Sequence, residues 1–178
     1  MIREAPLAFR IDFYLHNTMR RIVLCLFNWL PPLLWMAMIF WFSTDRFSSA
    51  ATGSRFELII GWLAPWIEEA SRMRLHHLVR KLGHLTEYGL LAVLWMRALE
   101  SYDWGGGLNR WRARALVVML IVSAYALFDE WRQTLTATRS GSLIDCGIDT
   151  AGGVIGLLLR RRLLYFTRAT RRKSIDLD

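Results

Sequence analysis

The stretch YALFDEWRQ, residues 125–133, ends an apolar run with two acids, an arginine and a glutamine. On a helix, Tyr125, Asp129 and Gln133 recur every four residues and therefore share one face. A carboxylate near a helix C-terminus opposes the helix dipole, so Asp129 is hard to explain as a simple surface residue. Asp129 and Glu130 are therefore our candidates for acid/base chemistry.

A second polar cluster occurs in KLGHLTEY, residues 81–88. At 100° per residue, Lys81, His84 and Tyr88 fall within about 60° of one another, and Glu87 lies roughly 60° further round. A histidine on this face could exchange protons with an acid, and a lysine could hold an anionic ligand. This cluster adds His84 to the acid/base candidates and Lys81 and Tyr88 to the ligand-binding candidates.

A third cluster follows, with Asp145 and Asp149 one helical turn apart and Arg139 just before them. These three residues and Gln133 complete the candidate ligand-binding set. Plainer explanations exist for single residues. Asp145 alone fits a helix cap, where a carboxylate gains roughly 0.3–1 kcal/mol, and Lys81 alone fits a side chain reaching toward the membrane surface.

The elements that must position these clusters are apolar runs near bilayer length, which indicate an integral membrane protein. The chain has 178 residues, of which 54% are hydrophobic. We predict one all-α membrane domain over residues 1–178, built as a four-transmembrane-helix bundle. The predicted spans are residues 22–42, 82–99, 115–131 and 144–162, and residues 160–178 form a basic tail.

The first outer loop is predicted to carry helices that lie in the membrane interface. STDRFSSAATGS is interpreted as an extended polar loop, after which Ser54 and Glu57 form a capping box. PWIEEASRMRLHHLVRKL then places apolar residues at helical spacing beside tryptophan. The pair His76 and His77 is interpreted as a feature of this interfacial helix, because no third ligand accompanies it.

The distribution of basic residues predicts the orientation. Fifteen Lys and Arg residues lie in the N-terminal segment, the second loop and the tail, against eight in the first and third loops. The positive-inside rule then places both termini in the cytoplasm of a multi-pass inner-membrane protein. The same rule accounts for the net charge of +8, and no nucleic-acid-binding motif is present, so no nucleic acid partner is predicted. All three polar clusters therefore meet at the outer end of the bundle.

The charges of this outer end do not balance. The cations are Lys81, Arg132 and Arg139, and the acids are Glu87, Asp129, Glu130, Asp145 and Asp149. The excess acids are protonated, balanced by a charged His84, bound to a divalent cation, or turned toward water. We hypothesise that at least one carboxylate is protonated or accepts a proton. No zinc, Walker or cofactor motif occurs, so no cofactor and no metal ligand set is predicted.

KLGHLTEYGLLAVLWMRAL and YALFDEWRQTLTATRSGSLIDCGIDTAGGVIG together resemble the VanZ-like family. These are small bacterial membrane proteins named for one that accompanies teicoplanin resistance. The resemblance implies a place in the cell envelope, but no established reaction. It rests on K-x-x-H-x-x-x-Y, D-E-x-x-Q, a loop arginine and D-x-x-x-[N/D] followed by glycines. Where that pattern usually has Asn, this chain has Asp149, which adds a negative charge.

Gly152 and Gly156 form a small-xxx-small pair, which allows close helix contact in lipid. We predict that this pair packs inside the monomer, and a dimer face is the alternative.

Three functions remain open. The first is a pocket at the outer face that binds or processes an envelope lipid or a glycopeptide-like amphiphile. There, Lys81 and Arg139 would hold its anionic group, and Asp129 or Glu130 would act with His84 as acid and base. The second is a non-catalytic accessory protein, whose polar network fixes helix packing or recruits a partner. The third is a small proton-coupled transporter. Whether the chain is an enzyme is left open.

Overall fold

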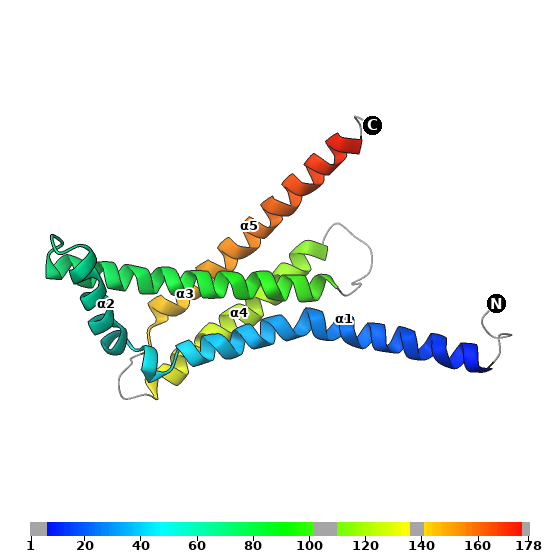
Figure 1. The fold of residues 1–178 in the computed structure, drawn as a ribbon, viewed down its shortest axis with the longest axis horizontal. Coiled ribbons are helices and arrows are strands. Elements are labelled where there is room, and N and C mark those ends of the chain that lie inside the picture. Colours follow the sequence, from blue (N-terminus) through cyan, green and yellow to red (C-terminus); the bar gives the residue numbers. More distant parts are fainter. Residues whose placement is uncertain (1–6, 102–109, 136–140, 176–178) are drawn as a thin grey trace.

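The computed structural model describes residues 7–101, 110–135 and 141–175, and within them every regular element is a helix. The elements are α1 (Leu7–Phe42), the short 3₁₀ helix η2 (Asp45–Phe47), α2 (Ser49–Leu63), α3 (Glu69–Glu100), α4 (Arg110–Thr134) and α5 (Leu143–Ile175). The all-helical prediction is confirmed for these residues. In Figure 1 the C-terminal ends of α1 and α4 and the start of α5 gather at one end, beside α2.

Within the part of the chain that the structure describes, two helices are long and apolar enough to cross a membrane. They are residues Ile22–Phe42 within α1 and Arg110–Thr134, which is α4. Both match predicted spans closely. The spans predicted within α3 and α5 stay predictions, because charged residues interrupt the apolar character of both helices. α1 is continuous through Pro31 and Pro32, and its axis changes direction along its length in Figure 1.

α3 and α5 cross at a contact made of glycines. A Cβ atom added to Gly152 would lie 3.0 Å from Leu85 Cα, and one added to Gly156 would lie 2.9 Å from Gly89 Cα. The carbonyl oxygens of Leu85 and Gly89 would be closer still. Only residues without a Cβ allow these backbones to touch, so the small-residue pair acts within one chain in this structure.

The core lies where α1 and α4 cover this crossing. Tyr88, Leu91 and Met96 of α3 and Val118 and Val122 of α4 are fully buried. α1 is attached to the core by polar as well as apolar contacts. The Trp35 indole Nε1 donates to the Glu87 backbone oxygen at 2.8 Å, and the Tyr125 hydroxyl donates to the Met36 oxygen at 2.6 Å. These bonds fix the C-terminal half of α1 against α3 and α4.

The first loop differs from the prediction. Residues expected to be extended form η2 and the beginning of α2, and the cap is Ser48, whose hydroxyl accepts the Ala51 N–H at 3.2 Å. Ser54 lies inside the helix, and no capping box forms there, since Glu57 pairs instead with Arg72 at 2.7 Å. Because Ser48 caps the helix six residues before Ser54, the run of small residues after Ser48 is helical.

Candidate functional site

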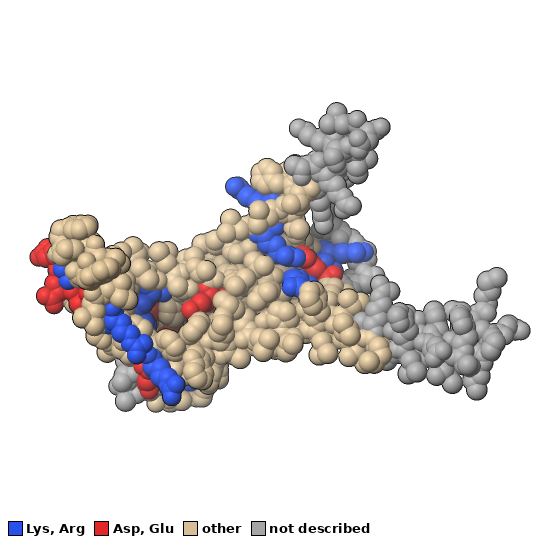
Figure 2. All heavy atoms as spheres, viewed as in Figure 1, with Lys and Arg blue, Asp and Glu red and all other residues tan. Residues whose placement is uncertain are grey.

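A cavity of about 380 Å³ lies between the C-terminal end of α1, η2, α2, the first half of α3 and the end of α4. One part of its wall is apolar and the other is ionisable. Figure 2 shows acidic and basic atoms together in the recess beside α2. The lining residues are Ile39, Phe42, Ser43, Phe47, Thr52, Phe56, His76, Val79, Arg80, Gly83, His84, Glu87 and Asp129.

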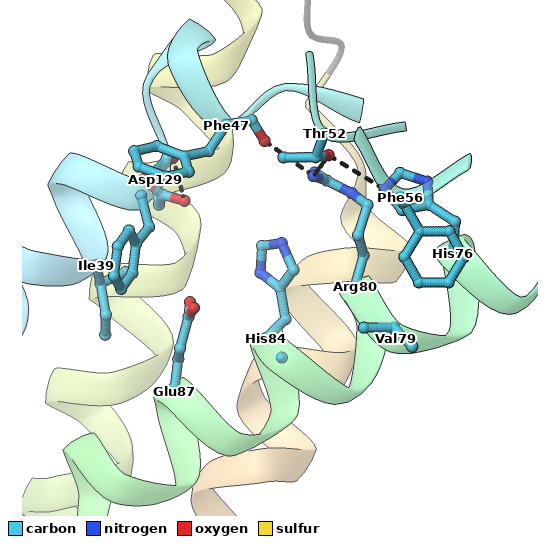
Figure 3. Close-up of a pocket in the computed structure, with 13 residues that line it drawn as sticks. Ile39, Phe47, Thr52, Phe56, His76, Val79, Arg80, His84, Glu87 and Asp129 are labelled. Atoms are coloured by element: carbon cyan, nitrogen blue, oxygen red, sulfur yellow. Dashed lines mark hydrogen bonds between the residues drawn. The ribbon is translucent and has the colours of Figure 1, made fainter. Parts of the chain in front are cut away.

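α3 supplies the ionisable wall through Arg80, His84 and Glu87, which fall on one helix face and point into the same space (Figure 3). The Arg80 guanidinium is held from the far side of the cavity. Its Nη1 donates to the Phe47 backbone oxygen at 2.9 Å and to the Thr52 hydroxyl at 3.3 Å. The position of this cation is therefore set by η2 and α2.

His84 contacts a buried acid from α5. Its Nδ1 lies 3.3 Å from Asp149 Oδ1, and Asp149 is fully buried. Among the described residues, neither Asp149 oxygen has a hydrogen-bond partner, and the hydroxyl of the equally buried Tyr88 has none either. A buried acid with so few partners is costly, so Asp149 is under-satisfied by comparison with other buried acids.

Asp129 shows the opposite situation. Its Oδ2 accepts from the Ser43 hydroxyl at 2.8 Å and from Gln133 Nε2 at 2.9 Å, and its Oδ1 lies 3.3 Å from Arg132 Nη2. The Arg132 guanidinium also lies over the Phe40 ring, 4.4 Å from its centroid. This network joins the end of α1 to the end of α4 and saturates the carboxylate, which is 1% exposed.

Glu130 performs a similar joining role toward α5. Its Oε2 accepts the Ser142 backbone N–H at 2.6 Å, and its Oε1 lies 3.4 Å from Gln133 Nε2. At Gly141 an added Cβ would lie 2.7 Å from Thr134 Cγ2, so the chain passes tightly over the end of α4. Glu130 thus holds the start of α5 against α4, and it does not line the cavity.

The remaining candidates are distributed unevenly. Lys81 is exposed and does not line the cavity, whereas its neighbour Arg80 does. Asp145 lies half-buried in the first turn of α5, where its backbone N–H lies 3.4 Å from the Ser142 hydroxyl oxygen. Arg139 lies outside the described residues. Thus His84 and Asp129 reach the cavity, Asp149 and Tyr88 lie buried behind it, and Lys81 points elsewhere.

Sequence reasoning missed Arg80, and it left Glu87 out of the candidate set. Both lie within about 60° of His84 on the helix, so a face centred on His84 would have found them. It also missed Ser43 and Thr52, for which no local pattern gave a signal. His76 is interpreted as an interfacial residue from the sequence, but its side chain is buried. Its Nε2 lies 3.1 Å from the Thr52 hydroxyl oxygen.

Burial and neighbouring positive charge disfavour the protonated form of His76. Burial, followed by the charge of Arg80 and the neighbouring His77, lowers the pKa of His76 below its ordinary value. Burial also lowers the pKa of Arg80, although Asp145 and Glu87 oppose that shift. Arginine remains protonated regardless. Arg80 therefore places a positive charge in the cavity lining at neutral pH. Among the described residues, no group of three or more His, Cys, Asp or Glu side chains is placed to hold a metal ion.

Comparison with known proteins gives one match. Residues 28–165 match the VanZ/LLP1 family model, which is more than half of the chain, so the chain belongs to the VanZ-like family. No curated protein and no solved structure matches it. Family membership and the two apolar helices together indicate a membrane protein of the cell envelope.

Proposed function

We propose that this VanZ-like chain is a multi-pass inner-membrane protein whose cavity binds an amphiphile of the envelope, either a lipid or a glycopeptide-like molecule. In this proposal α1, α3, α4 and α5 each cross the membrane, both termini are cytoplasmic and the cavity opens at the outer face. The distribution of Lys and Arg supports this orientation. In Figure 1 the N-terminal end of α1 and the C-terminal end of α5 both lie away from α2, which supports a common side for the two termini.

The observation that carries the proposal is the divided character of the cavity wall. Phe42, Phe47 and Phe56 offer an apolar surface, while Arg80 and Glu87 offer charge on the facing helix. Ligand pockets are mostly apolar with a few polar groups that fix orientation. A molecule with an apolar tail and an ionic head satisfies both parts of this wall.

If the bound molecule is processed, we assign the acid/base roles differently from the sequence-based prediction. Asp129 and Glu130 have their oxygens engaged in holding helices together. His84 instead faces the cavity with Asp149 behind it. In an acid/base step His84 would exchange the proton and Asp149 would orient and charge-stabilise the imidazole, as acids behind catalytic histidines do.

The test is to fill the cavity without disturbing the fold. An atom added at Gly83 meets nothing within 4 Å, although Gly83 lines the cavity, so Gly83→Leu should occupy it. Gly147 is equally open but exposed on α5, which makes Gly147→Leu a matched control. We expect mass spectrometry of the purified proteins to find amphiphile bound to the wild type and the control, but not to Gly83→Leu. Equal amounts on all three would refute the proposal.

A non-catalytic accessory role is the second candidate, and the saturated Asp129 network favours it. If the polar groups serve only packing, a variant that stays folded should keep its biological function. Loss of function in a folded His84→Gln protein would argue for the pocket, whereas full function would argue for the accessory role.

A further inference from the structure

Two opposite charges face the cavity without pairing. Arg80 donates to a backbone carbonyl and a hydroxyl, but no described carboxylate lies within ion-pair distance of it. The Glu87 carboxylate points into the same space and has no hydrogen bond or ion pair with any described residue (Figure 3). A cation and an anion thus share one wall, and neither lies within ion-pair distance of an opposite charge on any described residue.

Their spacing explains why they do not neutralise each other. Seven residues separate them, which is about 10 Å along the helix axis. His84 lies between them and turns its Nδ1 toward Asp149. The bonds to Phe47 and Thr52 hold the guanidinium at the end of the cavity away from Glu87. The separation is therefore built into three elements, α3, η2 and α2.

The other ionisable residues of the lining have partners of their own or are disfavoured as charged groups. His84 faces the buried Asp149 at 3.3 Å. Asp129 is saturated by Ser43, Gln133 and Arg132, and burial and the charge of Arg80 disfavour the protonated form of His76. A purely anionic ligand would be attracted by Arg80 but repelled by Glu87. A purely cationic ligand would be attracted by Glu87 but repelled by Arg80. Charges in a partly desolvated cavity favour a ligand that supplies both partners.

We infer that the ligand head group is zwitterionic, with a phosphate at Arg80 and a primary ammonium at Glu87, as in a phosphoethanolamine lipid. This inference rests on the proposed function and specifies its ligand. A guanidinium fork suits phosphate oxygens. A carboxylate requires a donor, which a primary ammonium has and a quaternary one lacks. The apolar residues Ile39, Phe42 and Phe47 would receive the first part of the acyl chains.

The experiment is a lipid titration of the full chain in detergent, followed by native mass spectrometry. Phosphatidylethanolamine, phosphatidylglycerol and phosphatidylcholine with identical acyl chains are compared. Loss of a charge-assisted hydrogen bond changes affinity by about tenfold or more. We therefore expect at least that preference for phosphatidylethanolamine. Glu87→Gln should abolish the preference. Arg80→Gln should weaken the binding of all three lipids, because each carries the phosphate. The exposed neighbour gives the control, Lys81→Gln, which should change nothing.

The possible results distinguish a wrong head group from a cavity that binds no lipid. Equal binding of the three lipids, or a preference that survives Glu87→Gln, would overturn the zwitterionic head group while leaving a lipid cavity in place. No more lipid on the wild type than on Gly83→Leu would overturn the cavity itself. Free phosphoethanolamine is the final arm. If free phosphoethanolamine displaces the lipid with an affinity equal to that of phosphatidylethanolamine, the head-group chemistry belongs to a soluble ligand. That result would refute a lipid as the ligand.

Discussion

Substitution of Gly152 and Gly156 by alanine tests the contact that aligns the proposed site. These glycines press against Leu85 and Gly89 of α3, next to His84, and Asp149 lies one turn before Gly152 on α5. Added Cβ atoms would lie 2.9–3.0 Å from the Cα atoms opposite them, where ordinary contact starts at 3.4 Å. The two helices must therefore separate, and His84 and Asp149 must separate with them.

Two opposing effects determine the change in the free energy of unfolding. Alanine is favoured over glycine inside a helix by about 1 kcal/mol per site. Overpacking costs about 1–3 kcal/mol per site, and a gap of roughly 0.5–1 Å also forfeits a quarter to a half of the dispersion attraction along the contact. The clash is with backbone, which cannot rotate away, so the cost wins. We expect the double variant to lose about 2–3 kcal/mol, or about 5–10 °C in melting temperature.

The two cysteines make the assay direct. Cys25 is exposed and Cys146 is buried at the start of α5. In a Cys25→Ser background, a fluorogenic thiol reagent reports when Cys146 becomes accessible on heating. Gly147→Ala is the control, because an added Cβ there meets nothing. A double variant that melts at or above the Gly147→Ala protein would refute the glycine-contact argument.

Three further predictions follow from the same contacts. Asp129→Ala should destabilise the protein by about 1–3 kcal/mol, because Ser43 would lose its acceptor; unchanged thermal unfolding would contradict that role. Tyr125→Phe removes the bond to the Met36 oxygen and should cost about 1 kcal/mol, measured in the same thiol assay. Since the folded-state pKa of His76 is lowered from 6.5, the unfolded chain binds more protons, so stability should fall as pH drops through that value. A His76→Gln variant should show a flatter dependence of melting temperature on pH between pH 8 and 5, and an unchanged slope would count against this.

Helical periodicity explains why part of the site could be predicted. Spacing alone placed Asp129 with Gln133 and His84 with Tyr88, because residues a turn apart share a face on any helix. Spacing could not say how that face is rotated in the bundle. α3 is held by the α5 glycines on one side and by Trp35 of α1 on another. That rotation turns Arg80 toward the cavity and Lys81 away from it.

The roles of the acids were also beyond local patterns. Asp129 and Asp149 look alike in sequence, since each lies one helical turn after another polar residue. Their difference lies in distant partners. Ser43 reaches Asp129 from 86 residues away, whereas among the described residues the charged partner of Asp149 is His84. The start of α2 was misplaced for a related reason. Ser48 and Ser54 are both acceptable caps locally, and the packing of Thr52 against His76 and Arg80 favours the longer helix.

Because α3 and α5 touch through main-chain atoms, their spacing does not depend on the size or chemistry of the neighbouring side chains. Residues on either flank of that crossing can be exchanged by mutation while the scaffold stays at the same dimensions. Ligand specificity can therefore change by single substitutions in the cavity, while the packing of α3 against α5 stays the same.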